Sequence, residues 1–287
     1  MEIGQAKGYL LEYEVLRLLK KSDYVNVKKG QVRGRGAQHQ IDGYGVFSIP
    51  TAFVYPIRLL SESKCYKDPV ELEVVRNFVG VIKDISENYV VAKTHKRNSL
   101  YRYTDAGCIF SASPFVQSAQ EYAWAHNIFL VSFLEMTFME QILTRIDQSA
   151  RTPAMAAILN DNEGKKQERI IKEHKHFSKY NRLFDPTLVV GILDNIYPVI
   201  LVGTNDWIRH IKPPKTNDKL DAQKDFRQDF SQHGIIESNS RNNEPLQHVF
   251  HISIQGQPIT FSLPHFAAMR ILRRIRKSVG NEKIAAL

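Results

Sequence analysis

The sequence predicts an α/β protein with an N-terminal core of helices and strands, followed by a smaller α+β domain. In the first half of the chain, apolar residues at helical spacing alternate with short apolar runs that are typical of buried strands. Near residue 148 the sequence becomes polar and rich in Lys and Glu, which indicates a domain boundary. The charge divides there too, since residues 1–147 carry 18 basic and 16 acidic residues and residues 148–287 carry 21 and 14. The C-terminal half is therefore the basic one.

The N-terminal core, residues 1–147, is expected to follow the order helix, three strands, helix, strand, helix, strand, with one more helix after them. Its first helix ends in Lys20 and Lys21, where cations oppose the helix dipole. The Gly- and Arg-containing stretch QVRGRGAQ after the first strand should be a turn or loop. The expected elements are a helix within 8–24, strands at 24–29, 39–47 and 52–64, a helix at 70–86, a strand at 107–113, a helix at 114–127, a strand at 128–133 and a helix at 134–147.

Beyond the core, residues 148–185 are expected to form a helical linker. Lys and Glu dominate this stretch, which is typical of a solvated helix. Residues 186–287 should form the basic α+β domain, with a role in recognition, sensing or oligomerisation. Its expected elements are a strand pair at 187–203, a polar loop with short helices at 204–247, a hairpin with a Gln-Gly-Gln turn at 248–264 and a basic helix at 265–278.

Composition excludes several classes of protein. No apolar run reaches the roughly 18–20 residues that a membrane span needs, and the acidic N-terminal stretch lacks a signal-peptide pattern. We therefore expect a cytoplasmic protein with no membrane partner. The only cysteines, Cys65 and Cys108, lie in no CxxC pair, which argues against a disulfide framework or a structural zinc site. The net charge of +9 suits a polyanionic partner such as nucleic acid.

Three tripeptides combine an acid, any residue and a lysine, and one of them differs in its setting. Those that begin at Glu163 and Glu173 lie in the polar linker, where a solvated helix face explains them. Glu62-Ser63-Lys64 instead ends an apolar strand, so strand alternation places Glu62 and Lys64 on one side. Asp42 ends a short apolar run on the preceding strand. Two carboxylates and an ammonium group are therefore expected to converge.

This constellation suits phosphodiester hydrolysis, because the transition state gathers negative charge on a phosphate that already repels hydroxide. Carboxylates from two strands can hold Mg²⁺, a hard cation that prefers oxygen ligands. The ion polarises the phosphate, lowers the pKa of a bound water and stabilises the leaving oxygen. Lys64 would orient or help deprotonate that water and would offset the charge of the pentavalent state.

The order of helix, Asp on the second strand, Glu-x-Lys on the third strand and a following helix resembles the pattern of the PD-(D/E)xK nucleases. GRGAQHQIDGYG, residues 34–45, is similar to the Gly-rich His-x-Ile-Asp segment of restriction endonuclease-like proteins of the Mrr type. In that group a Glu on the preceding helix approaches the metal, and Glu12 stands at the matching position. Residues 107–133 also resemble the late strand, helix and strand of the family. The resemblance covers about residues 5–135.

The resemblance implies a restriction endonuclease-like core, in which a mixed central sheet is flanked by helices. It also implies a Mg²⁺-dependent DNA endonuclease, with Mn²⁺ as a substitute ion, that acts in restriction or anti-phage defence. Asp42, Glu62 and Glu12 would bind the metal, and Lys64 would complete the catalytic set. A repair or recombination nuclease of the same fold, and a catalytically silent nucleic-acid-binding module, remain as alternatives.

Two features depart from the family pattern. Ile41 stands where the family name has Pro, and the connection that holds Pro50 and Pro56 is longer than a tight hairpin. The pairing of Asp42 with Glu62 therefore depends on a strand register that the sequence leaves open.

Contacts to DNA are expected from both halves of the chain. Helix capping would explain Ser113 and Gln117 equally well, and an exposed or hydrogen-bonded strand histidine would explain His39. A solvated helix face would explain the basic residues of the terminal helix. The C-terminal domain would serve as a DNA reader, a docking site for a defence-system partner protein or a signal ligand, or a homodimer interface. The candidate contacts are Arg33, Arg35 and His39 in or beside the Gly-rich loop, Ser113 and Gln117 at a helix N-terminus, and Arg273, Arg274 and Lys277 on the terminal helix.

Overall fold

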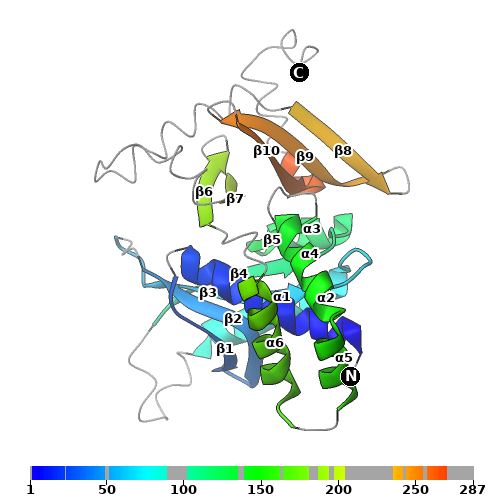
Figure 1. Ribbon diagram of the computed structural model, residues 1–287. Coiled ribbons are helices and arrows are strands. Elements are labelled where there is room, and N and C mark those ends of the chain that lie inside the picture. The colour runs from blue at the N-terminus through cyan, green and yellow to red at the C-terminus, as the bar shows by residue number, and fades with distance from the viewer. Residues whose placement is uncertain are drawn as a thin grey trace, which may run out of the picture.

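The computed structural model describes residues 2–22, 24–48, 52–88, 102–134, 139–161, 164–180, 187–193, 197–203, 235–241, 244–254 and 257–269. These ranges contain a five-stranded sheet with helices on both faces, and two smaller sheets nearer the C-terminus (Figure 1). The prediction of an α/β fold is therefore confirmed. Within the same ranges, no helix combines the length and the apolar character that crossing a membrane requires.

The central sheet is mixed, as predicted. β1, β2 and β3 pair antiparallel, and β3, β4 and β5 pair in parallel, so the strands lie in the order β1-β2-β3-β4-β5. Parallel pairs need crossover connections, and α2 and α3 lie in those connections. The strands are β1 (Tyr24–Arg33), β2 (Gln38–Phe47), β3 (Ile57–Lys64), β4 (Thr104–Ser111) and β5 (Ile128–Ser132), and the helices are α1 (Ile3–Lys21), α2 (Leu72–Ser86), α3 (Gln117–Ala125) and α4 (Met139–Ala150).

Each face of the central sheet has its own hydrophobic core, because side chains alternate along the strands. Phe110 of β4 packs in one core with buried residues of α1 and α4, including Leu10 and Met139. The neighbouring Ile109 packs in the other core with residues of α2 and α3, including Phe78. Burial of apolar surface stabilises a fold by about 25 cal/mol per Å². These two cores therefore stabilise the packing of the helices against the sheet.

β1 is longer than the sequence predicts. The expected strand at 24–29 continues to Arg33, so the expected loop QVRGRGAQ shrinks to the residues between β1 and β2. Two register shifts interrupt the pairing of β1 with β2, and Asn26 and Gly30 in that region have positive φ angles of 55° and 146°. Such bulges break the alternation on which a strand prediction relies. The ladder with β2 therefore extends the strand beyond the point where its own pattern stops.

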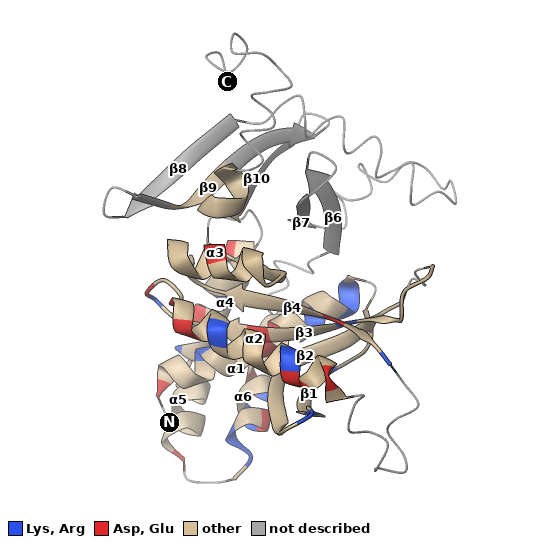
Figure 2. Ribbon diagram, turned by 180° about the vertical axis from the view of Figure 1, so that it is seen from behind, with Lys and Arg blue, Asp and Glu red and all other residues tan. Residues whose placement is uncertain are grey.

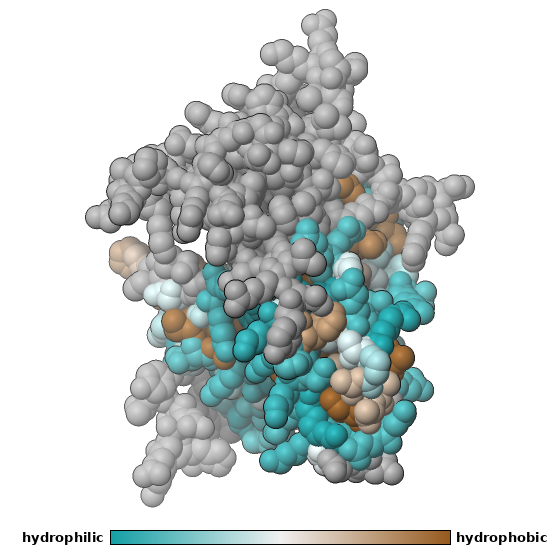
Figure 3. All heavy atoms as spheres, viewed as in Figure 1, coloured by the Kyte–Doolittle hydropathy of each residue, from teal (hydrophilic) through white to brown (hydrophobic). Residues whose placement is uncertain are grey.

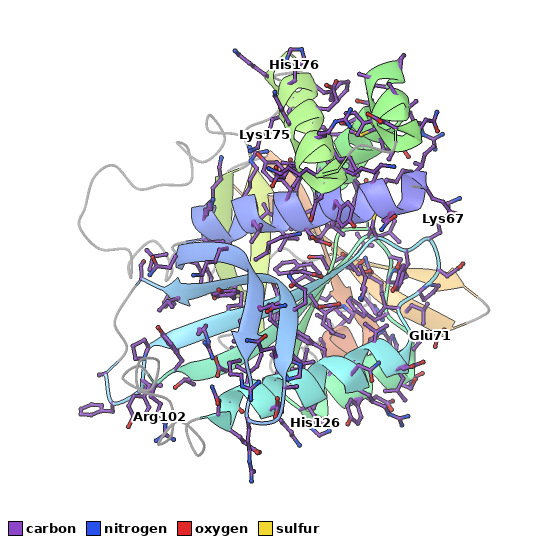
Figure 4. The ribbon with its side chains drawn as sticks, turned by 90° about the horizontal axis from the view of Figure 1, so that it is seen from below. Lys67, Glu71, Arg102, His126, Lys175 and His176 are labelled. Carbon is purple, nitrogen blue, oxygen red and sulfur yellow. The ribbon has the colours of Figure 1, made fainter. Side chains whose placement is uncertain are left out.

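The stretch expected to be a helical linker contains α5 (Pro153–Asn160) and α6 (Lys166–Tyr180). The expectation of a solvated helix is wrong for one face of α6, where Ile170 and His174 are fully buried. Figure 4 shows α1 between the central sheet and α6, with His176 on the outer side of α6. Charged residues therefore cover only the outer part of this helix, which packs on the core. The division of the chain into three domains remains a prediction.

The surface of the described part is mixed in character. Acidic and basic residues are interspersed over its helices and strands rather than gathered by sign (Figure 2). Hydrophilic residues dominate the face that Figure 3 shows, and the apolar residues on this face form small patches.

The C-terminal part contains a two-stranded and a three-stranded sheet. β6 pairs with β7, and β9 pairs with β10, as the sequence predicts. β8 lies within 204–247, where the prediction of loop and short helices is therefore wrong. The polar sequence of β8, IIESNSR, lacks the apolar alternation that predicts a strand. Antiparallel pairing with β9 holds this segment in the strand conformation. The bounds are β6 (Thr187–Leu193), β7 (Tyr197–Gly203), β8 (Ile235–Arg241), β9 (Glu244–Ile254) and β10 (Gln257–Pro264).

The end of β10 and the helical residues 265–269 pack against the N-terminal core. Leu263, Ala267 and Ala268 belong to the same buried cluster as Leu10 of α1. These residues come from the far end of the chain, so the N-terminal core is completed by a segment of the C-terminal part.

Gln120 of α3 joins the two parts through all the groups of its buried amide. Its Nε2 donates hydrogen bonds to Phe115 O at 2.6 Å and to Leu246 O at 2.8 Å. Its Oε1 accepts one from Phe266 N at 2.9 Å. Because the amide is buried, each of these partners would lack a hydrogen bond without it.

We expect Gln120→Ala to lower the free energy of unfolding by about 2–3 kcal/mol, since it leaves buried backbone groups unsatisfied. Urea unfolding measures this change. Gln117→Ala on the same helix is the control, because Gln117 is exposed and donates to the exposed Glu121 of the same helix at 2.9 Å. Equal unfolding free energies for the two variants would contradict the role given to Gln120.

We expect the folded protein to lose stability in mild acid because of His248 of β9. Its Nε2 lies 2.7 Å from Nδ1 of His265. Burial, and then the charge of His265, lowers the pKa of His248 from 6.5 to about 4. Between these values the unfolded chain binds a proton that the folded chain does not, so the free energy of unfolding falls as the pH falls through this window.

Urea unfolding at several pH values between about 7 and 4 tests this expectation. His248→Gln removes the titrating group and should make the free energy of unfolding less dependent on pH across the window. A pH dependence as steep as that of the wild type would show that another group is responsible.

Candidate active site

The register of β2 against β3 brings two of the predicted site residues together. Gly43 pairs with Ser61, whose Oγ donates a hydrogen bond to Gly43 O at 2.8 Å. A Cβ atom at Gly43 would meet Ser61 Oγ at 2.7 Å and a methyl group of Leu16 at 3.2 Å, so the strand approaches its neighbours too closely for a side chain here. Continued by one residue, this antiparallel register sets Asp42 opposite Glu62.

Asp42 of β2 is hydrogen-bonded to β3, and Glu62 and Lys64 of β3 are hydrogen-bonded to each other. Asp42 Oδ2 accepts a hydrogen bond from the backbone N–H of Ser63 at 2.9 Å. Lys64 Nζ donates to Glu62 Oε1 at 2.6 Å, and these two side chains are 22% and 21% exposed. The contact agrees with the alternation that places Glu62 and Lys64 on one side of β3. Their ion pair is shielded from most of the solvent but remains accessible.

Glu12 of α1 extends this group from the helix side. Lys29 Nζ of β1 donates to Glu12 Oε2 at 2.9 Å, and Gln167 Nε2 of α6 donates to the same oxygen at 3.3 Å. The Glu12 side chain is 15% exposed. Its charge acts on Glu62, and the charge of Asp42 acts on it in turn. The three carboxylates therefore form one electrostatic group.

Burial raises the pKa of each of these carboxyl groups above its ordinary value, because desolvation disfavours the charged form. The negative charge of Asp42 raises the pKa of Glu62 and Glu12 further. Burial alone would lower the pKa of Lys64, but the hydrogen bond and the charge of Glu62 raise it overall. The group thus contains repelling carboxylates beside a lysine that stays protonated.

As a set of donors, these carboxylates fit a hard divalent cation. Oxygen ligands are what Mg²⁺ prefers, and a cation would relieve the mutual repulsion that raises the pKa of the carboxyl groups. In the present arrangement Lys64 and Lys29 supply the neutralising charges on Glu62 and Glu12. Across the described ranges, no three Asp, Glu, His or Cys side chains converge closely enough to hold an ion. The assignment of Asp42, Glu62 and Glu12 as metal ligands stays a prediction.

The glycine-rich loop between β1 and β2 is bound to the end of α2 by Asp84. The Asp84 carboxylate accepts hydrogen bonds from Gly36 N at 2.7 Å and Ala37 N at 3.2 Å. Its Oδ2 also lies 2.6 Å from Nε2 of His39. The hydrogen bond with His39, followed by the one from Gly36 N–H, lowers the pKa of Asp84. His39 therefore holds the loop in place through Asp84.

The two arginines of this loop are exposed. Arg35 Nη1 pairs with Glu87 Oε2 at 3.3 Å, and the exposed Arg33 ends β1 opposite Gln38. Asp42 lies four positions after Gln38 along β2, a distance of about 13 Å at strand spacing. The arginines are therefore close enough to the carboxylates for one nucleic acid to contact both, and their role stays a prediction.

The other candidate nucleic-acid contacts lie elsewhere. Ser113 is buried, and its Oγ donates to Asp68 O at 2.8 Å. The N-cap residue of α3 is Val116, so neither Ser113 nor Gln117 caps this helix through its side chain. Neither of them lies in the carboxylate group. Arg273, Arg274 and Lys277 fall outside the described residues.

Sequence reasoning missed three side chains that organise this region. Lys29 and Gln167 bind Glu12, and Asp84 binds the glycine-rich loop. The alternating strand pattern that includes Lys29 indicates no partner, and Gln167 lies in a stretch whose composition predicts a solvated helix. No local motif connects positions that are 17 and 155 residues away from Glu12.

Residues 3–139 match the model of a protein family described as restriction endonuclease, of the Mrr type. This span includes the strands and the helix that carry Asp42, Glu62, Lys64 and Glu12. Residues 3–139 belong to the Mrr-type restriction endonuclease family. The family assigns nuclease chemistry to this domain, and the match stops before α5 and α6.

Two solved structures resemble the chain weakly. The protein of unknown function AF1548 is 16% identical, with 60% of this chain and 98% of that chain covered and a TM-score of 0.32. The DNA modification-dependent restriction endonuclease AspBHI is 13% identical, with 62% of this chain and 40% of that chain covered and a TM-score of 0.29. Similarities of this size carry no inference about function. No match is found among curated proteins.

We expect Gly43→Ala to destabilise the restriction endonuclease domain by about 1–3 kcal/mol, because the added methyl group overpacks the space between β3 and α1. Gly80→Ala is the matched control. A Cβ atom at Gly80 in α2 meets nothing within 4 Å, so this change should stabilise the helix by about 1 kcal/mol. Urea unfolding of both variants measures the effect, and a Gly43→Ala variant as stable as the wild type would contradict the close approach.

Proposed function

We propose that the protein is a Mg²⁺-dependent endonuclease that cleaves DNA, with Mn²⁺ as a substitute ion. The observation that carries this proposal is the register that sets Asp42 opposite Glu62, next to the ion pair of Glu62 with Lys64, within the span that matches the restriction endonuclease family. The charge of Glu12 acts on the same group. Hydrolysis of a phosphodiester needs positive charge near the phosphate and a positioned water, and this group of residues suits both needs.

The bound metal would polarise the phosphate and lower the pKa of a water molecule. The chain itself contributes the carboxylates of Asp42, Glu62 and Glu12 as ligands. Lys64 holds its proton at Nζ, and its positive charge would offset the negative charge that gathers in the transition state. A lysine with a raised pKa is a poor proton acceptor, so an electrostatic role for Lys64 is favoured over that of a general base.

The glycine-rich loop is proposed to contact the DNA backbone. Arg33 and Arg35 are exposed there, and the hydrogen bonds from Gly36 N and Ala37 N to Asp84 hold the loop at the end of α2. Arginines of this kind bind phosphate without reading the sequence. Recognition of sequence or modification is assigned to the C-terminal part, and restriction or anti-phage defence in the cytoplasm is the setting that the family suggests.

We expect Glu62→Ala and Lys64→Ala to lower the rate of plasmid cleavage in Mg²⁺ by about 100-fold or more, because each removes a group that acts on the transition state. Gel electrophoresis of supercoiled, nicked and linear forms measures the rate. EDTA should abolish cleavage by the wild type, and added Mg²⁺ or Mn²⁺ should restore it.

Lys165→Ala is the control for Lys64→Ala. Lys165 follows the same acid-x-Lys pattern, but its side chain is 80% exposed and it lies outside the carboxylate group. Cleavage by the control should equal that of the wild type. Equal cleavage by the wild type and both site variants would contradict the proposal. It would also be contradicted if the wild type cleaved no DNA in the presence of any divalent ion. Cleavage of RNA alone would refute DNA as the substrate.

A further inference from the structure

We propose that Gln167 of α6, together with Lys29 of β1, is a positioning residue that holds Glu12 for metal binding. The inference rests on the proposed function and extends it to a helix outside the matched family span. It makes α6 a required part of the active site rather than a linker.

The first support is the geometry at Glu12. Lys29 Nζ and Gln167 Nε2 both donate to Oε2, at 2.9 Å and 3.3 Å. Two donors from different elements, bound to one oxygen, restrict the rotation of the carboxylate. Among the described residues, Oε1 accepts no hydrogen bond and is left for a ligand. A carboxylate held in this way need not lose further freedom when it binds a cation.

The second support is the attachment of α6 to α1 near Glu12. Gln167, Ile170 and His174 are separated by three and four residues, so they lie on one face of α6. Ile170 and His174 on this face are fully buried, and His174 Nε2 lies 3.0 Å from Oε1 of Glu14. Glu14 is only two residues from Glu12. The buried contact therefore fixes α6 against the part of α1 that carries the proposed ligand.

Lys175 adds a second contact between α6 and α1, and Arg17 holds the Glu14 carboxylate from within α1. Arg17 Nη1 donates to both carboxylate oxygens of Glu14, at 3.0 Å and 2.9 Å. Lys175 Nζ lies 5.2 Å from the centre of the Tyr13 ring. Figure 4 shows α6 along the side of α1 that is turned away from the sheet. A helix held at several points can place the Gln167 amide precisely enough to orient Glu12.

The third support is the nature of the contact. Residues that hydrogen-bond a metal ligand typically change metal affinity or activity by about 10–100-fold when they are mutated. Gln167 is uncharged, so it orients the carboxylate without cancelling its charge. Lys29 is charged, and its ammonium group lies 2.9 Å from the Glu12 carboxylate, so it both orients and partly neutralises that group.

The test is Gln167→Met in the full-length protein, which keeps the length of the side chain and removes its donor. Binding of Mn²⁺ is measured by titration calorimetry, the ion requirement of plasmid cleavage by titration, and folding by thermal unfolding. Gln141→Met is the matched control, because Gln141 is an exposed glutamine of α4 with no role in the site.

We expect Gln167→Met to weaken Mn²⁺ binding by about 10-fold, to raise the ion concentration for half-maximal cleavage to match, and to leave thermal unfolding close to that of the wild type. The control should equal the wild type in all three. Unchanged ion binding and ion requirement in Gln167→Met would overturn the inference. A lower unfolding temperature with unchanged ion binding would also overturn it, since Gln167 would then serve only stability.

If Gln167→Met does not fold, Lys29→Met tests the same Glu12 oxygen from β1. Mn²⁺ binding as tight as that of the wild type would then overturn the inference, and weaker binding by a folded variant would support it. A wild type that neither binds the ion nor cleaves DNA would refute the proposed function and the inference with it. A wild type that does both isolates the contribution of Gln167.

Discussion

The pairing of Gly43 with Ser61 is the constraint on which the candidate active site depends. The absence of a side chain at Gly43 lets β2 approach β3 and α1, and the Ser61 hydroxyl binds the Gly43 carbonyl across the gap. Side chains alternate along a strand with a period of two, so a slip by one residue would send Asp42 to the other face of the sheet from Glu62. With the register held, Ser63 N–H binds the Asp42 carboxylate, and the acids of two strands meet.

The meeting of these acids places like charges where little water can screen them. Burial and mutual repulsion raise the pKa of Glu62 and Glu12, and Lys64 and Lys29 offset part of that cost. An arrangement that is unfavourable for the folded chain alone is typical of a functional site, where a ligand or substrate supplies the missing partner. The same electrostatics explain why the proposed function places a divalent cation here.

Helix α1 connects the site with the rest of the molecule. It carries Glu12, packs its apolar residues under the sheet and binds α6 through Glu14 and His174. The core under α1 also contains Leu263 from the far end of the chain. The restriction endonuclease domain at residues 3–139 is thus packed against segments that lie outside the family match.

The sequence by itself determined the order of elements in the core, the sharing of one strand side by Glu62 and Lys64, and the candidate position of Glu12. These follow from local periods of 2 and 3.6 residues and from a short family pattern. Only the tertiary structure decided the register of Asp42 against Glu62, the strand β8, the buried face of α6 and the contacts of Lys29 and Gln167. Those features arise where segments distant in sequence pair or pack. No local sequence pattern identifies the partners of the residues involved. The acids could be recognised from the sequence, whereas the residues that hold them could be found only in the folded chain.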